Sequence, residues 1–265
     1  MAEQCLNCSE TITANFCSNC GQKKFKRIDK KYIWDELQYT VFHTNKGLLY
    51  SLKQLVKNPG KTAREFISGN RVNHYKPILL LFVLSGISTF LSYKVLNFRT
   101  IMETYFAKQQ MNTGFMNDFM SLISSYNALF MLMLVPLFAL TTKIAFRSWG
   151  HNYYEHLVMN TYILSFYTIL NIVFLYPVMF FYRHNPDTFF SLTQYAFIAV
   201  PFMLVLFFKT FYYEKPLKAV LLRVLGVLGL TAAGYMLFII IAVIAGIIIA
   251  ISQGGPEALQ YFKKQ

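Results

Sequence analysis

Long apolar stretches separated by short polar segments dominate the chain after residue 76. A helix needs about 20 predominantly apolar residues to cross a hydrocarbon core of about 30 Å. Five stretches meet this requirement, at residues 77–95, 121–142, 157–182, 188–208 and 224–252. The third and fourth are joined by the short turn RHNPD, which predicts an antiparallel pair. The pattern therefore predicts an all-α polytopic membrane protein with about five transmembrane helices.

The fifth stretch is longer than a bilayer requires, because it runs for 29 residues without a charge. A single helix of that length measures about 43 Å, so it has to tilt, emerge from the membrane or break. Gly226, Gly229 and Gly234 mark the positions where a break is easiest. Two crossings of about 14 residues each are too short to span. Five crossings are therefore favoured, and a re-entrant first half is the alternative.

The basic residues are unevenly distributed around these stretches. The chain holds 25 Lys and Arg against 12 Asp and Glu, a formal net charge of +13, and 13 of the basic residues lie between Lys23 and Lys76. With the N-terminus inside, 19 basic residues lie on the cytoplasmic side and 6 on the other. Cytoplasmic loops of membrane proteins are enriched in Lys and Arg. We therefore predict a multi-pass protein of the bacterial cytoplasmic (inner) membrane with a cytoplasmic N-terminus and a periplasmic C-terminus.

All four cysteines lie near the N-terminus in the spacing C-x2-C-x8-C-x2-C, at Cys5, Cys8, Cys17 and Cys20. Two Cys-x-x-Cys turns can present four thiolates to one zinc ion, and Gly21 suits the tight turn after the last cysteine. Residues 1–22 are therefore predicted to be a zinc ribbon whose zinc is structural, since a four-thiolate shell leaves no open position for catalysis. Disulfides, a redox motif, another metal and an unmetallated state are the alternatives, and a cytoplasmic location disfavours the disulfides. A vestigial fold cap is the alternative to a docking role for the ribbon.

A basic region with helical stripes, residues 23–76, precedes the first apolar stretch. One stripe has the spacing i, i+1, i+4, i+7 and i+8 and consists of Leu48, Leu49, Leu52, Leu55 and Val56. A short helix is predicted over 61–68, and a weaker stripe consists of Ile33, Trp34, Leu37 and Val41. Basic amphipathic helices beside a span typically lie in the membrane interface. We accordingly predict contacts with anionic lipid headgroups from Lys53, Lys57, Arg64 and Arg71.

A protein contact is the alternative for this region. Nucleic acid is not expected as a partner, because the aromatic residues lie on the apolar stripes and the lysines are spread around several helices.

The run NKGLLYSLKQLVKNPGKTAREFISGNRVNHYKPILLLFV, residues 45–83, resembles the leading segment of a bacterial membrane family called domain of unknown function 3667. The matching positions are Lys46, Gly47, Pro59, Gly60, Arg64, Glu65, Phe66, Gly69, Arg71 and Pro77. YYEHLV, residues 153–158, is similar to the family's Tyr-x-Glu-His-Leu-Val, but Tyr162 and Leu164 stand where members often have further histidines. The five-span plan is also similar to Yip-type membrane-trafficking proteins, at the level of fold alone. The resemblance implies a membrane protein with an N-terminal ribbon and implies no activity.

Polar residues at membrane depth are functional candidates by default. One candidate cluster, at the start of the third span, consists of His151, Glu155, His156 and Asn160. His151 and Glu155, at i and i+4, are expected to share a helix face, whereas His156 points about 100° away from Glu155. A metal or proton site and a hydrogen-bonded interfacial pair are both open interpretations. Asn127, Asn160 and Asn171 are expected to bond between helices, and Arg223 is expected to extend to the headgroups.

The predicted organisation is a zinc ribbon (1–22), a basic interfacial region (23–76), a transmembrane helical domain (77–252) and a C-terminal tail (253–265). The sequence favours a non-enzymatic adaptor or organising protein whose ribbon docks a protein partner, and no catalytic residues are assigned. A small-molecule or ion transporter or channel is the alternative, favoured by Pro136 within a span and by the glycines of the fifth stretch. An intramembrane enzyme using Glu155 and the two histidines is the third reading. The sequence leaves the oligomeric state open.

Overall fold

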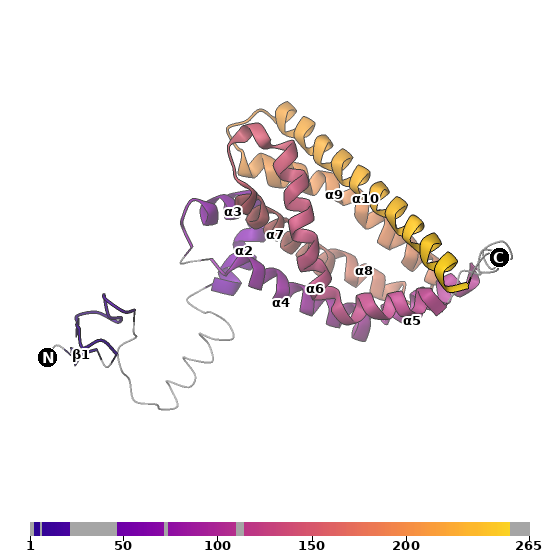
Figure 1. Cartoon of the computed structure of the whole chain (residues 1–265), viewed down its shortest axis with the longest axis horizontal. Helices are drawn as coiled ribbons and strands as arrows, with labels where there is room; N and C mark the ends of the chain where they lie inside the picture. Colours follow the sequence, from indigo (N-terminus) through magenta and orange to yellow (C-terminus); the bar gives the residue numbers. More distant parts are fainter. Residues whose placement is uncertain (1–2, 6, 22–46, 72–73, 110–113, 255–265) are drawn as a thin grey trace. The chain divides into compact units, whose positions relative to one another are not determined.

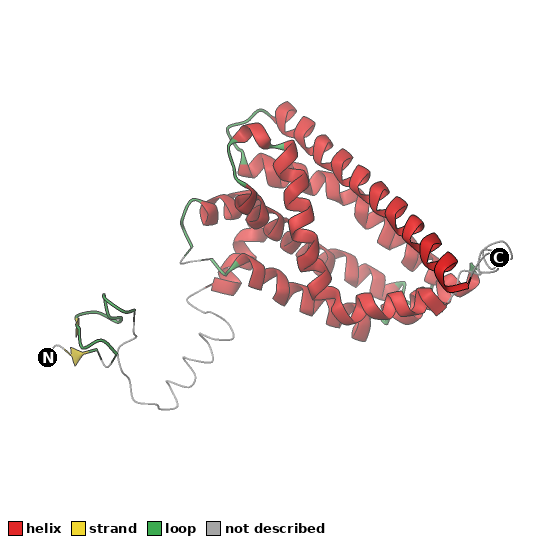
Figure 2. Cartoon of the chain, in the orientation of Figure 1, coloured by secondary structure: helices red, strands yellow, loops and turns green. Residues whose placement is uncertain are grey.

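Helices form nearly all of the described chain beyond residue 46 (Figures 1 and 2). The computed structural model describes residues 3–5, 7–21, 47–71, 74–109 and 114–254. The chain divides into two compact units, residues 1–48 and 49–265. The predicted stripe at 33–41, most of the basic region and most of the C-terminal tail lie outside the described residues. The described helices are α2 (Gly47–Lys57), α3 (Pro59–Ile67), α4 (Pro77–Phe90), α5 (Phe98–Lys108), α6 (Gly114–Ala145), α7 (Tyr153–Leu170), α8 (Tyr176–Phe181), α9 (Pro186–Phe211) and α10 (Leu217–Gly254).

Five helical segments of the described residues are long and apolar enough to cross a membrane: Pro77–Val95, Ser125–Ala145, Tyr153–Phe181, Pro186–Phe211 and Leu217–Ile241. They correspond one to one to the five apolar stretches of the sequence. Many of their outward-facing side chains are large and apolar, such as Phe202, Leu225 and Met236. Lipid solvates such side chains while the helix satisfies its own backbone. The prediction of an all-α, multi-pass membrane protein is therefore confirmed.

Two of these spans contain a π turn. The first continues from α4 into η2 (Leu91–Val95), and the third runs from α7 through η4 (Asn171–Leu175) into α8. Pro177 follows η4 and lacks an amide hydrogen, and in a regular helix its ring would crowd the carbonyl one turn earlier. The wider turn relieves that crowding, so the span remains helical to Phe181.

The fifth span does not break at its glycines. α10 is one helix of 38 residues that begins seven residues before the apolar stretch predicted from sequence. A glycine inside a helix costs about 1 kcal/mol relative to alanine, whereas an unpaired backbone group in lipid costs several. The helix therefore continues through Gly226, Gly229 and Gly234, and the re-entrant alternative is wrong.

α2 and α3 form a helical pair joined at Asn58. Near the beginning of α2, Ser51 Oγ accepts a hydrogen bond of 2.7 Å from the backbone amide of Tyr75, two residues before α4. At the end of α2, Val56 lines a groove with Ile87 of α4. α3 packs against α7 and α9, and Phe66 near its end lines a second groove with Pro77. The pair is therefore attached to the membrane-spanning helices mainly through α3.

The joint has the local sequence of a helix start. Asn58 precedes α3 and its side-chain oxygen accepts a 3.0 Å hydrogen bond from the amide of Lys61. Pro59 occupies the first helical position, where no amide hydrogen is needed. α3 thus begins at 59 rather than at the predicted 61.

Gly60 brings the backbone of α3 into direct contact with the backbone of α9. A Cβ at this position would lie 2.2 Å from the carbonyl oxygen of Phe207 and 2.3 Å from the amide nitrogen of Phe211. The Gly60 amide donates to Thr210 Oγ1 over 3.2 Å. Any side chain at residue 60 would therefore force the two helices apart.

Arg64, one turn further along α3, completes this contact. Its guanidinium donates to the carbonyl oxygens of Thr210 at 3.3 Å and Phe211 at 3.0 Å, and it stacks over the ring of Tyr213 at 4.3 Å. The last carbonyls of a helix have no partner within the helix and attract a cation. Arg64 therefore caps the C-terminal end of α9.

We predict that Gly60→Ala destabilises the protein, because the new methyl group collides with α9 backbone that cannot move without unpacking. An overpacking penalty of about 3 kcal/mol would lower the midpoint of thermal unfolding by about 5–10 °C. The measurement is thermal unfolding in detergent followed by size-exclusion chromatography. Gly86→Ala is the control, since Gly86 is also helical but has open space around its Cβ position. Equal midpoints for the two variants would contradict the close approach.

His74 lies buried between the helical pair and α4. Its ring packs edge-on against Tyr50 with centroids 5.4 Å apart, and its Nε2 lies 3.4 Å from Glu65 Oε2. Burial lowers the pKa of His74 below its ordinary value of 6.5, although the Glu65 carboxylate opposes that shift. The folded protein therefore keeps His74 neutral at a pH where the unfolded chain is protonated.

This burial predicts a loss of stability in mild acid. As the pH falls through 6.5, the unfolded state takes up a proton at His74 before the folded state does, so the free energy of unfolding decreases. Replacing His74 by Phe keeps the ring contact with Tyr50 and should reduce the difference between midpoints of unfolding measured at pH 7.5 and pH 5.5. His184→Phe, at an exposed histidine, is the matched control and should leave that difference as in the wild type. An unchanged difference in the His74 variant would refute the assignment.

Candidate functional site

The N-terminal unit is a pair of similar turns, each built on a Cys-x-x-Cys sequence. Strand β1 (Glu3–Gln4) pairs with the antiparallel strand β2 (Thr11–Ile12) around the first turn. Ser9 and Gly21 each follow a second cysteine, and they have φ angles of +60° and +73°. The amide of Ser9 donates to the carbonyl of Cys5 over 2.9 Å, and that of Gly21 to the carbonyl of Cys17 over 3.0 Å. The expectation that Gly21 allows a tight turn is confirmed.

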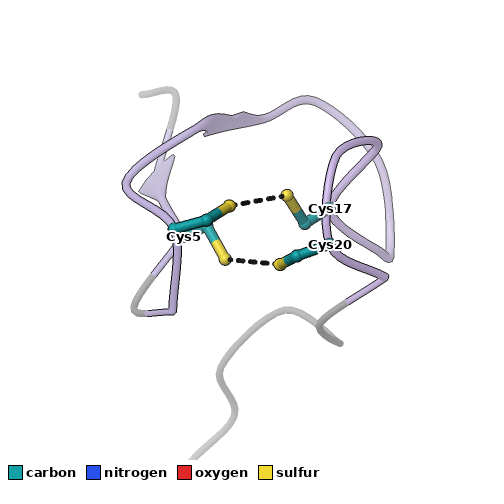
Figure 3. Close-up of side chains that lie close together, drawn as sticks. Cys5, Cys17 and Cys20 are labelled. Atoms are coloured by element: carbon teal, nitrogen blue, oxygen red, sulfur yellow. Dashed lines mark hydrogen bonds between the residues drawn. The ribbon is translucent and has the colours of Figure 1, made fainter.

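These two turns direct four sulfur atoms toward one point. The Sγ atoms of Cys5, Cys8, Cys17 and Cys20 all lie within 4.8 Å of one another. The Cys5–Cys20 and Cys8–Cys17 pairs are each 3.5 Å apart, too far for a disulfide and close to the edge of about 3.8 Å of a tetrahedron with bonds of about 2.3 Å. Figure 3 shows the thiols of Cys5, Cys17 and Cys20 facing one another across the unit. The four cysteines can therefore hold a metal ion.

The same sulfurs account for most of the buried apolar side chains that the structure describes in residues 3–5 and 7–21. These are Cys5, Ile12 and Cys17, with Cys8 packed against them. Segments this short commonly rely on a metal or a disulfide for stability. A bound ion would therefore add stability where the described apolar core is small.

A second group of polar side chains lies between the ends of α6, α7 and α9. Thr142 of α6 is at its centre and is 1% exposed. Asn160 of α7 donates to Thr142 Oγ1 over 2.7 Å and to the carbonyl of His156 over 2.8 Å. His156 Nδ1 lies 3.1 Å from the same hydroxyl. His151 joins from the loop before α7, with its Nδ1 3.1 Å from the hydroxyl of Tyr212 and its ring 6.5 Å from that of His156.

The hydroxyl of Thr142 is the meeting point of these hydrogen bonds. Within α6 it lies 2.9 Å from the carbonyl of Phe138 and 3.1 Å from that of Ala139. It also accepts from Asn160 and lies next to His156 Nδ1. His156 Nε2 is fully buried and has no hydrogen-bond partner in the described part of the chain.

Glu155 does not join this cluster, and the expected shared face with His151 is wrong. α7 begins at Tyr153, so His151 lies before the helix and not one turn along it. Glu155 instead forms a capping box: its amide donates to Asn152 Oδ1 over 2.9 Å, and its Oε2 accepts from the Asn152 amide over 2.7 Å. Sequence spacing alone did not reveal the capping role of Glu155, because that role depends on which residue begins the helix. The cluster consequently has no carboxylate.

Two further polar residues bridge spans. Asn127 of α6 donates to Thr89 Oγ1 of α4 over 2.7 Å, as expected for an interhelical bond. Arg223 of α10 donates to the carbonyl of Ala145 over 2.6 Å and to Ser148 Oγ over 2.9 Å. Arg223 therefore caps α6, an intramolecular role in place of the headgroup contact expected from its position.

The four residues predicted to contact lipid headgroups fall into two pairs. Arg64 caps α9, and Arg71 donates to the carbonyl of Phe66 over 3.3 Å and lies over its ring. Lys53 and Lys57 are exposed on α2 and line an apolar groove. The two arginines thus have partners within the protein, whereas the two lysines remain predicted headgroup contacts.

The motif that suggested a family is located at the contact between α3 and α9. Gly60 permits the close approach, Arg64 caps α9, and Glu65 lies beside His74. Gly69, with a φ of +105°, ends the α3 turn in a conformation that favours glycine. These motif residues therefore have structural roles: they hold the helical pair of α2 and α3 against the membrane-spanning helices.

Comparison with known proteins agrees with this segment. Residues 45–89 match the family model described as "Protein of unknown function (DUF3667)". Comparisons with curated proteins and with solved structures give no match. The chain is therefore a multi-pass helical membrane protein that carries, at residues 45–89, the family segment of the DUF3667 proteins of unknown function.

Proposed function

We propose that the protein is a non-enzymatic adaptor of the bacterial cytoplasmic membrane whose N-terminal unit binds one structural zinc ion and docks a cytoplasmic protein. The observation that carries the proposal is the convergence of four thiols within 4.8 Å, in a segment whose described buried apolar side chains are mostly these cysteines. Four thiolates satisfy the coordination preference of zinc and leave no position open for water or substrate. Such a site folds a recognition module and performs no reaction.

The surface of the unit favours a protein as the docked partner. Phe16 is 57% exposed, and an exposed aromatic side chain is a common anchor in protein interfaces. The described residues of the unit up to Gly21 include Glu3 and Glu10 and no lysine or arginine. Four zinc-bound thiolates would add further negative charge. Nucleic acid is thus disfavoured as a partner of this unit.

The charges at the ends of the spans support the proposed orientation. Basic residues gather where α6 and α9 end and α10 begins: Lys143, Arg147, Lys209, Lys215, Lys218 and Arg223. At the opposite ends of the spans, Lys108 pairs with Asp187 at 3.0 Å and Arg99 pairs with Glu103 at 2.7 Å. The first end is the one enriched in basic residues, as expected for the cytoplasmic side.

A transporter is the second candidate, because α7 carries buried polar atoms that have no hydrogen-bond partner among the described residues. These atoms are His156 Nε2, Tyr162 Oη and Ser165 Oγ. An imidazole nitrogen can accept a proton or bind a cation, which is the chemistry that a proton-coupled transporter needs within its spans. The two candidates differ in which part of the chain is essential. Loss of a cellular phenotype in Asn160→Leu but not on deletion of residues 1–22 would favour transport over the adaptor.

The zinc assignment predicts one zinc ion per chain in protein purified without chelators, measured by elemental analysis. The double variant Cys5→Ser with Cys17→Ser should lose that zinc, because it removes one thiolate from each turn. Ser18→Ala, which changes a residue inside the second turn without removing a ligand, is the matched control and should retain zinc. A stoichiometry near zero in the wild type, or zinc in the double variant, would sink the assignment.

The docking role predicts a partner that depends on the N-terminal unit. Crosslinking in intact cells followed by mass spectrometry should identify at least one cytoplasmic protein that is lost on deletion of residues 1–22. Phe16→Ala should weaken the same crosslink about tenfold if Phe16 is the anchor, while Thr13→Ala, at another exposed position, should not. An identical list of crosslinked proteins with and without the unit would rule out recruitment by it.

A further inference from the structure

An apolar groove lies between α2, α4 and the third span. Its volume is about 580 Å³. Aliphatic side chains from three segments line it: Leu52 and Val56 of α2, Leu84 and Ile87 of α4, and Ile169 and Ile172 of the third span. Two of its three walls belong to candidate membrane spans, so its aliphatic lining is suited to a lipid acyl chain.

Two lysines of α2 lie at this groove. Lys53 and Lys57 are four residues apart, so they project from the same side of the helix with Cβ atoms about 6 Å apart. Both are exposed, and neither makes a hydrogen bond or ion pair within the described residues. No acidic residue occurs between residues 47 and 64. The groove therefore carries two positive charges that the protein itself does not compensate.

Lys53 and Lys57 lie close to one end of the membrane-spanning segments. Lys57 is three residues before Gly60, whose backbone meets the last turn of α9 at Phe207 and Phe211. Basic side chains at such a position are attracted to anionic lipid headgroups. Arg64, by contrast, already donates to the last carbonyl groups of α9.

We propose that this groove binds one anionic phospholipid, with the phosphate between Lys53 and Lys57 and an acyl chain along the aliphatic residues of α4 and the third span. The two lysines supply charge complementarity, and the groove supplies apolar surface continuous with the bilayer. A soluble phosphate would satisfy only the first of these features. The lipid is held by the helical pair that Gly60 fixes to α9, so the site is built into the fold and differs from diffuse attraction to a charged surface.

The test uses the full-length protein, delipidated and reconstituted in nanodiscs of phosphatidylcholine with a small fraction of phosphatidylglycerol. Native mass spectrometry should show one retained phosphatidylglycerol per chain. Lys53→Gln with Lys57→Gln should reduce its affinity about 25-fold, since each lysine near the surface contributes about fivefold in attraction to an anionic lipid. Lys94→Gln with Lys218→Gln is the control, because it removes the same charge at two exposed lysines away from the groove.

A second variant separates the groove from the charges. Ile87→Trp fills the groove while keeping both lysines, and it should also weaken lipid retention; Ile87 is 47% exposed, so the larger ring can be accommodated without unfolding. Unfolding midpoints of all variants should match the wild type. Equal retention in the two double-lysine variants, or displacement of the lipid by millimolar inorganic phosphate, would overturn the proposal.

Discussion

The backbone contact between Gly60 and α9 is the constraint on which the arrangement of the membrane unit depends. Two helices can come this close only when one of them has no side chain at the crossing. Here Gly60 of α3 lies directly against the backbone carbonyl of Phe207 and the backbone amide of Phe211 in α9, and its own amide donates to Thr210 Oγ1. This contact positions α3 between α7 and α9, and Arg64 then reaches the end of α9. α2 adjoins α3 at Asn58, and the hydrogen bond from the Tyr75 amide to Ser51 attaches it further to the segment before α4.

The membrane interior gives these end contacts more weight than they would have in water. Lipid offers the chain no hydrogen-bond donors, so the exposed carbonyls at helix ends are satisfied by the protein or by the interface. Arg64 serves α9 and Arg223 serves α6 in the same way, although they come from helices at opposite ends of the sequence. The spans are therefore connected at one end by charge-assisted hydrogen bonds between side chains and helix termini. Apolar packing supplies the contact area, and these bonds help define which helix ends meet.

The sequence indicated the number of spans and the cysteine turns because both depend on local patterns. Apolar length identifies a span, and the spacing of Cys5, Cys8, Cys17 and Cys20 identifies the convergence of thiols. The seating of Gly60 against Phe207 was not predictable, because about 150 residues separate the two partners. The role of Glu155 was missed for the opposite reason: it depends on the residue where α7 starts, which a single-sequence pattern leaves uncertain by a few positions. Thr142 carries no sequence signal of its own, since its importance comes from the two α7 side chains that meet it.

The described side chains of α10 are buried near the beginning of the helix. Val220, Val224 and Val227 are buried against the other helices, whereas residues 232–241 are all exposed. As one helix of 38 residues it measures about 57 Å, well beyond the thickness of a hydrocarbon core. A helix of this length fits a bilayer by tilting or by extending beyond it. Because no described contact holds residues 232–241, a change in bilayer thickness acts first on this part of the last span.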